Sequence, residues 1–294
     1  RGAVLVLGLF LEFERTRLAL LVGALFLLGL GAGALFFLAV GKAAGATWFL
    51  PFRRVPAALS ALILPSGLLV LLALGLRVFV DPHHVSHAPS PAWFREWWLQ
   101  PGFLMARAAG ILGLWVVFRK ILVNQSPNTG RSTSAVFLVV FALTVSLSAF
   151  DWVMPLWHHW SSTMFGVYLF SGLFTSALAA LGLTSLALKR EGAAEDFRDT
   201  HLHDLGKLLF GFSCFWMYIW FCQYMLIWYT DIPEEASLFA AQTRGGWAPL
   251  FYLNLVLNWA FPFFALLPRP AKMSQSVMMK DSVTILMGRF LDLY

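Results

Sequence analysis

Charged residues are scarce in this chain of 294 residues: they make up 12% of it, whereas 59% of the residues are hydrophobic. Water-soluble domains carry roughly 25% charged residues, so the composition excludes an ordinary soluble domain. The apolar residues come in long blocks rather than in amphipathic stripes, which is typical of integral membrane proteins. Lipid offers the backbone no hydrogen-bond partners, and these blocks must therefore form helices. We expect an all-α, polytopic membrane protein.

Cysteine is also rare. Cys214 and Cys222 lie eight residues apart in one apolar segment, which is too far along a helix for a disulfide. Two thiols alone make no metal site, and we interpret both as small apolar side chains. The sequence also lacks a CxxCH haem-attachment motif, a phosphate-binding loop and a zinc-protease signature.

The histidines are poorly placed for haem. A membrane haem b needs histidines well inside facing helices, whereas all seven lie in predicted loops or at helix ends, at positions 83, 84, 87, 158, 159, 201 and 203. We therefore expect no catalytic residue in this chain, and no metal or other cofactor bound by it.

Seven apolar segments and the start of an eighth approach the length of about 20 residues that a membrane span needs. We place them at 18–40, 56–80, 102–122, 133–153, 162–188, 205–229 and 248–268, with the eighth from 277 onward. Residues 1–17 are expected to hold the end of a truncated upstream helix and a loop, and both ends of the chain to be cut from a longer protein. The spans form a first group of four, residues 18–153, and a second group of three plus the truncated eighth, residues 154–294.

Basic residues gather in alternate loops. Those after spans one, three, five and seven hold Lys42, Arg53, Arg54, Arg119, Lys120, Arg131, Lys189, Arg190, Arg198, Arg269, Lys272 and Lys280. The opposite loops hold two basic residues, Arg95 and Arg244, but the acids Asp81, Glu96, Asp151, Asp231, Glu234 and Glu235. By the positive-inside rule the basic loops are cytoplasmic, and the loops at 154–161 and 230–247 are periplasmic.

Span four carries polar residues on one predicted helical face. Thr144, Ser148 and Asp151 follow each other at spacings of four and three. Such hydroxyls can lead protons to a carboxylate, or they can bond to their own backbone or join helices. An acid at membrane depth is costly and indicates function. Arg107, in span three, needs a partner at a similar height, for which Asp151 and Glu96 are the candidates.

Span six opens with a second polar group. His203, Lys207 and Tyr218 share one stripe with small residues, and Asp204 can pair with Lys207. The group can collect protons at the cytoplasmic mouth and pass them to Tyr218. It can equally be a snorkelling lysine with an acid that complements the helix dipole.

Two hypotheses combine these residues. In one, protons enter at span six and leave along span four, past the candidates His203, Asp204, Lys207, Tyr218, Thr144, Ser148, Asp151 and His159. In the other, Asp151 and His159 fix the loop between spans four and five. An Arg107–Asp151 ion pair would favour the second hypothesis.

Four longer stretches carry a family resemblance. They are FDWVMPLWHHWSSTMFGVYLFSGLF (150–174), HLHDLGKLLFGFSCFWMYIWFCQYMLIWYTDIPEE (201–235), GGWAPLFYLNLVLNWAFPFFALLPRPAK (245–272) and GRFLDLY (288–294). Together they resemble the F subunit of bacterial alternative complex III, in the polysulfide-reductase-type (NrfD-like) family of membrane proteins. Pro155 and the pair Trp157–His158 depart from the family pattern, as does Asp231, where asparagine is commoner.

The resemblance implies a subunit of a quinol:electron-acceptor oxidoreductase of the bacterial inner membrane. Such a complex oxidises menaquinol or ubiquinol and passes electrons through iron–sulfur and haem c subunits to a periplasmic cytochrome or similar carrier, in respiration or photosynthesis. The quinol site belongs mainly to a sister NrfD-like subunit. The F-type subunit is expected to be a scaffold and a candidate proton-translocation route, built from two four-helix bundles.

The resemblance also implies which partners and cofactors to expect. Quinone, haem c and iron–sulfur clusters belong to the partner subunits, a terminal oxidase is a candidate further partner, and nucleic acid is not expected. Two alternatives stay open. A quinol-binding anchor of a polysulfide-reductase-like enzyme would need an aromatic pocket beside Asp151 or His159. A secondary transporter would show inverted repeats and helices broken at mid-membrane.

Overall fold

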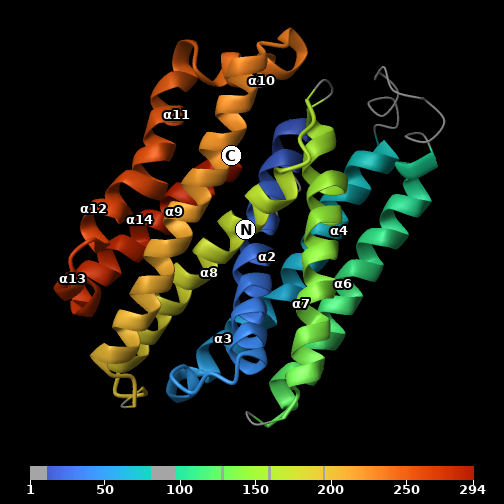
Figure 1. Ribbon diagram of the computed structural model, residues 1–294. Helices are drawn as coiled ribbons and strands as arrows, with labels where there is room; N and C mark the ends of the chain where they lie inside the picture. Colours follow the sequence, from blue (N-terminus) through green and yellow to red (C-terminus); the bar gives the residue numbers. More distant parts are fainter. Residues whose placement is uncertain (1–11, 81–96, 127–128, 158–159, 195) are drawn as a thin grey trace.

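The computed structural model describes residues 12–80, 97–126, 129–157, 160–194 and 196–294. Within these ranges the chain is helical and contains no β-strand. Long helices run up and down alongside one another, and short helices and turns join them at the two ends (Figure 1). The chain is thus an all-α, multi-pass membrane protein, as the composition predicts.

Seven helical stretches are long and apolar enough to cross a membrane. They are α2 (Phe13–Ala43), α3 to α4 (Arg54–Leu59, Ser60–Leu62 and Ile63–Val80), α6 (Pro101–Asn124), α7 (Arg131–Ser148, then Ala149–Val153 and Met154–Leu156), α8 (Phe165–Arg190), α9 (Asp199–Thr230) and α11 to α12 (Ala248–Leu255, Val256–Ala260 and Phe261–Leu266). Short helices α10 (Pro233–Gln242) and α13 (Arg269–Met273) lie between spans. The seven predicted spans are confirmed, although residues 13–17, predicted to lie outside them, belong to α2.

The predicted eighth span corresponds to α14 (Gln275–Leu293). This helix is 19 residues long but carries several charged residues, and it falls short of the hydropathy of the other seven. It packs against α8, α11 and α12. Other helices therefore enclose its polar face, on which Asp281, Ser282 and Arg289 are buried.

The helices pack as two groups joined along one seam. In the first group, α2 packs against α4 and α7, and α6 packs against the same two helices. In the second group, α8 and α12 each pack against α9 and α14. The most extensive helix contact within the described chain is that of α2 with α8, which joins the groups at the centre of the molecule (Figure 1).

Glycines allow α2 and α8 to approach closely at this seam. A Cβ atom placed on Gly33 would lie 2.5 Å from the Cβ of Ala177 and 2.9 Å from the carbonyl oxygen of Leu173. One placed on Gly29 would lie 3.2 Å from the Cβ of Leu173. The two glycines are four residues apart and share one face of α2, as in other close helix pairs in membranes. The seam therefore depends on the absence of side chains at these positions.

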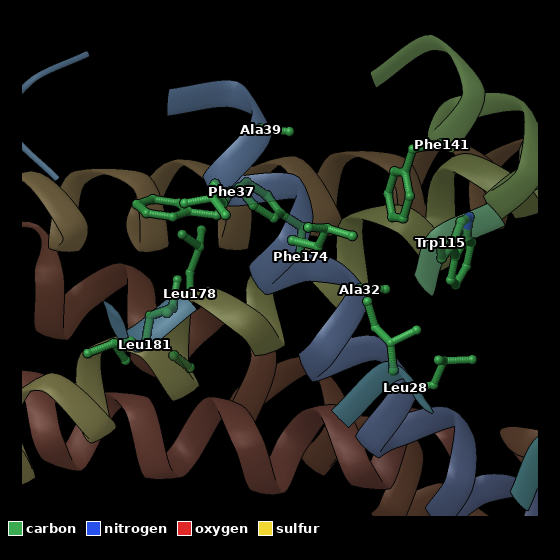
Figure 2. Close-up of a cluster of buried hydrophobic side chains, with 14 of the residues drawn as sticks. Leu28, Ala32, Phe37, Ala39, Trp115, Phe141, Phe174, Leu178 and Leu181 are labelled. Carbon is green, nitrogen blue, oxygen red and sulfur yellow. The ribbon is translucent and has the colours of Figure 1, made fainter. Parts of the chain in front are cut away.

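Aromatic rings fill the interior around the seam. The ring of Phe36 on α2 lies 5.4 Å from that of Phe141 on α7 and 5.0 Å from each of Phe170 and Phe174 on α8. Phe141 lies 5.2 Å from Trp115 on α6. Figure 2 shows part of this cluster, where side chains of α2, α6, α7 and α8 meet. One continuous core therefore spans both groups of helices.

Two buried lysines cap helix ends at the basic end of the bundle. The Lys42 ammonium donates to the carbonyl oxygens of Leu122, at 2.6 Å, and of Gln125, at 3.0 Å, where α6 ends. Lys272 donates to the carbonyl oxygen of Leu266, where α12 ends. The last carbonyls of a helix have no helical partner and carry the negative end of its dipole. Each lysine therefore supplies both a donor and a compensating charge.

Two π-helical turns interrupt the spans. One is Ala149–Val153, at the end of span four, and the other is Val256–Ala260, in span seven. A π-turn inserts one extra residue into a helix and is frequent at functional sites. Asp151 lies in the first turn and Asn258 in the second, and both side chains are buried.

We predict that Gly33→Ala destabilises the protein, because the added methyl group collides with Ala177 and the backbone of α8. Overpacking of this kind costs about 1–3 kcal/mol, which a lower melting temperature of the purified protein in detergent would report. The matched control is Gly23→Ala on the same helix, where an added Cβ has no neighbour within 4 Å. Equal melting temperatures for the two variants would contradict the role assigned to the seam.

Candidate functional site

Asp151 is buried at the end of span four, with a residue exposure of 1%. Its carboxylate oxygen Oδ2 accepts a hydrogen bond from Nε of Arg107 at 2.8 Å, and Oδ1 accepts one from the indole Nε1 of Trp98, also at 2.8 Å. The ion pair between Arg107 and Asp151 suggested by the sequence is therefore present. The predicted alternative partner, Glu96, lies outside the described residues.

Arg107 is itself held on several sides. Its Nη1 donates to the carbonyl oxygen of Trp98 at 3.0 Å, and its guanidinium lies 4.0 Å from the ring centre of Trp98 and 4.5 Å from that of Phe103. Both oxygens of Asp151 are thus engaged, as are Nε and Nη1 of Arg107. The third nitrogen of Arg107, Nη2, is buried without a partner among the described residues. This arrangement suits a fixed anchor between span three and span four.

A second contact holds the chain that follows. Arg77, near the end of α4, donates from Nη2 to the carbonyl oxygen of Pro155 at 2.8 Å. Two arginines from different helices thus hold the end of span four, one through Asp151 and one through the backbone. His159, which the sequence grouped with Asp151, lies outside the described residues.

The hydroxyls of span four bond mainly to their own helix. Thr144 donates to the carbonyl oxygen of Val140 at 2.7 Å, and Ser148 donates to that of Thr144 at 2.8 Å. Thr144 also accepts a hydrogen bond from the indole of Trp115 at 2.9 Å, which links α7 to α6. The observed bonds are those of the structural interpretation, in which the hydroxyls bond to their own backbone or join two helices.

The polar stripe of α9 faces outward at Lys207 and Tyr218, whereas His203 and Asp204 are partly buried. Nζ of Lys207 lies 2.6 Å from Oδ1 of Asp204, and Nδ1 of His203 lies 4.0 Å from the same oxygen, so these three residues do form a cluster. However, the Lys207 side chain is 55% exposed, and Tyr218 further along is 61% exposed. Tyr218 therefore lies on the surface of the described chain rather than between its helices, which the sequence pattern did not reveal.

A buried polar cluster that the sequence analysis missed lies in the second group. Nη2 of Arg289 lies 2.8 Å from Oδ2 of Asp292, and both side chains are less than 5% exposed. The other oxygen of Asp292 accepts hydrogen bonds from the hydroxyl of Tyr168 and, at 2.8 Å, from Nδ2 of Asn254. The Arg289 guanidinium lies 4.9 Å from the ring centre of Trp216. Helices α8, α9, α11 and α14 thus meet at one ion pair.

This cluster continues into the π-turn of span seven. Nδ2 of Asn258 donates to Oδ1 of Asn254 at 2.5 Å, and the hydroxyl of Ser213 on α9 donates to the carbonyl oxygen of Asn258. Ser213 and Asn258 are each 1% exposed. A hydrogen-bonded chain of polar groups therefore runs from α9 to Asp292 through the interior of the second group.

Asp281 is a further buried acid on α14. Its exposure is 0%, and neither carboxylate oxygen has a hydrogen-bond partner among the described residues. Burial without a partner strongly disfavours the charged form of a carboxyl group. Asp281 and Asp292 are 11 residues apart on α14, a separation of roughly 16 Å along the helix.

A cavity lies at the seam, between the two ion pairs. Its volume is about 50 Å³, and its walls are mainly apolar. From the first group it is lined by Trp115, Ser148 and Trp152, and from the second by Gly172, Ser176 and Arg289, with part of α2 between them. Within the described chain, Nε and Nη1 of Arg289 are buried without partners. The cavity thus has aromatic walls and free donors on one side.

The residues of this buried cluster do show a pattern in the sequence, although the sequence analysis did not use it. Arg289 and Asp292 stand three residues apart, and Asn254 and Asn258 four apart, so each pair shares a helical face. Each pair is also an uncommon polar interruption in an apolar segment, which is a mark of function inside a membrane. The pairing of Asp292 with Tyr168, 124 residues earlier, depends on the tertiary fold.

Comparison with protein-family models finds no match for this chain, and no curated protein matches it. Within the described part of the chain, no group of three or more His, Cys, Asp or Glu side chains is placed to hold a metal ion. The candidate site consists of two buried ion pairs with a cavity at the seam between the helix groups, and the unpaired acid Asp281 lies farther along α14.

We predict that Asp151→Asn destabilises the protein, because it leaves the Arg107 guanidinium buried without a counterion. Breaking one side of a buried ion pair costs about 3–5 kcal/mol. Thermal unfolding in detergent measures this loss. Adding Arg107→Gln to Asp151→Asn should recover part of it, since the unpaired charge is then gone. A single variant that melts at the wild-type temperature would show that Asp151 is no anchor.

Proposed function

We propose that this chain is a membrane subunit of a quinol:electron-acceptor oxidoreductase of the alternative complex III type. In this proposal it resides in the bacterial cytoplasmic membrane, with its basic loops in the cytoplasm. It acts as a scaffold beside the sister subunit that oxidises quinol, and it offers a route for protons. The resemblance of four long stretches to the F subunit of that complex supports the family, and the charge distribution of the loops supports the orientation.

The observation that carries the proton route is the line of buried acids on α14. Asp281 stands near the end of the bundle that carries the basic loops, without a partner among the described residues, and Asp292 stands further along the same buried face. Acids are expensive inside a membrane bundle and mark proton relays. We place proton uptake at Asp281 and transfer at Asp292 and Tyr168.

This route differs from the proton route that the sequence suggests through span six and span four. Tyr218 and Lys207 are exposed on the outside of α9, so they serve a route within this chain less well than the interior of α14. Beyond Asp292, the route continues through the cavity at the seam. Arg289 lines this cavity, and so does Ser148, which directly precedes the π-turn that contains Asp151. Asp151 marks the far end of the route, where its ion pair with Arg107 also fixes the helix ends.

A second candidate function is quinol binding by this chain itself. The lining of the cavity at the seam supports it, because Trp115 and Trp152 form aromatic walls and Asp151 directly precedes Trp152 in the sequence. The cavity has a volume of about 50 Å³, so it would have to widen to admit a quinol ring. Free N–H groups of Arg289 suit a neutral carbonyl acceptor, since its charge is already compensated by Asp292. A ligand pocket of mainly apolar walls with a few polar groups is the usual form of such a site.

We predict that the tagged chain, purified gently from its native membrane, brings haem c and iron–sulfur subunits with it. Haem absorbance and the subunit pattern on a gel measure this outcome. Quinone extracted from the isolated chain, free of its sister subunit, would instead favour the second candidate. A chain that purifies alone, with neither quinone nor haem, would contradict both and point to a transporter.

We predict that Asp281→Asn lowers proton translocation by the whole complex while electron transfer continues. The substitution removes a titratable proton, yet it breaks no ion pair or hydrogen bond among the described residues. Proton release per electron in vesicles holding the complex measures the effect, with Asp196→Asn on the exposed loop before α9 as the matched control. An unchanged ratio in Asp281→Asn would remove α14 from the proton route.

A further inference from the structure

A second cavity lies at the basic end of the first group, away from the ion pairs described above. Its volume is about 160 Å³. It lies between the last turns of α2, the residues leading into α3, and the end of α6. The cationic side chains that line it are Lys42, Arg53 and Arg54, and no acidic side chain lines it.

Lys42 forms the floor of this cavity and is fixed there. Its residue exposure is 5%, and its ammonium uses two donors on the carbonyl oxygens of Leu122 and Gln125. An ammonium has three N–H donors, so one remains for another acceptor. A buried lysine held in this way presents its charge at a defined position.

Arg53 and Arg54 form the rim. Both are exposed, and neither has an ion-pair partner in the described part of the chain. Other basic residues lie close by: Arg119 on α6 bonds to Ser60 at 3.1 Å. The positive charge of this corner is therefore uncompensated by the chain itself. Guanidinium groups match the geometry of phosphate oxygens and bind them through paired hydrogen bonds.

The remaining walls are mainly apolar, apart from Gln125. They include Leu38, Phe49, Leu50 and Val123. On α6, whose end lines the cavity, Leu114, Val117 and Ile121 share one face and are 43%, 53% and 39% exposed on a span that crosses the membrane. A ligand with a negative head and apolar chains can thus place its head in the cavity and its chains along α6.

We propose that this cavity binds the phosphate headgroup of an anionic phospholipid, with its acyl chains lying along α6. Basic pockets between spans at one face of a membrane protein are the kind of site that takes such headgroups. The location supports a lipid over a soluble anion, because the cavity lies at the end of membrane-spanning helices and its walls are mainly apolar apart from the cations and Gln125. The proposal does not depend on the function proposed above.

The test compares lipid binding by two double variants of the purified chain. Arg53→Gln with Arg54→Gln removes the rim charges, and Arg269→Gln with Lys280→Gln removes two exposed charges from the same end of the second group. Phosphatidylglycerol is titrated into each protein in neutral detergent and counted by native mass spectrometry. We expect roughly tenfold or greater weakening in the first variant and less than twofold change in the second.

Three further measurements distinguish binding of an anionic lipid from misfolding, from binding of any lipid and from binding of a soluble anion. Arg53→Lys with Arg54→Lys should retain most of the binding, which shows that a loss in the glutamine variant reflects charge rather than misfolding. Phosphatidylcholine should bind the wild type and the glutamine variant equally. Inorganic phosphate should neither displace the lipid nor raise the melting temperature.

Several results would overturn the proposal. Equal weakening in both double variants would mean general charge attraction, and undiminished binding in the Arg53 and Arg54 variant would place the lipid elsewhere. If inorganic phosphate alone bound and phosphatidylglycerol did not, the cavity would be a site for a soluble anion.

Discussion

The close approach of α2 and α8 is the contact on which the other features depend. Gly29 and Gly33 bring the two backbones together, and this packing joins the two groups of helices. The same seam contains the cavity, with Trp115 and Trp152 on one side and Arg289 on the other. Without close packing there, the Arg107–Asp151 ion pair and the cluster around Asp292 would lie in two separately packed groups of helices. The glycines therefore determine the relation between the two polar sites.

Most of the buried ionisable side chains described above have a partner, which is an opposite charge or, for Lys42 and Lys272, the carbonyl end of a helix. Arg107 pairs with Asp151 and Arg289 with Asp292, each at 2.8 Å, across or within helices. Asp281, by contrast, is buried without a partner in the described chain. The two pairs act as fixed points in the bundle because breaking either would leave a bare charge. The unpaired acid is the one whose protonation can change at little structural cost.

Much of the fold could be predicted from the sequence, because lipid imposes strong constraints on length and hydropathy. The seven spans and the pairing of Arg107 with Asp151 follow from apolar blocks and from the cost of a lone buried charge. The prediction that Thr144, Ser148 and Asp151 share one helical face was a weaker guide to the structure. It assumed 3.6 residues per turn, but a π-turn begins at Ala149 and shifts the phase before Asp151 is reached.

The orientation of α9 and the cluster around Asp292 could not be predicted in the same way. Both faces of α9 are apolar enough for lipid, so hydropathy does not show which of them faces the other helices. Tyr218 fell on the outer face and Ser213 on the inner one. Asp292 depends on partners from α8 and α11, far away in the sequence. Periodicity identifies a shared face of one helix, but only tertiary packing decides what that face meets.

The two lysines that cap α6 and α12 connect insertion into the membrane with the stability of the folded bundle. Basic loop residues are usually regarded as signals that set orientation during insertion. Here Lys42 and Lys272 also neutralise the carbonyl ends of helices that finish at the same side. Helices running in that direction always present their negative dipole ends there. Replacing either lysine with a neutral residue would therefore change the charge of a loop and weaken the end of a span at the same time.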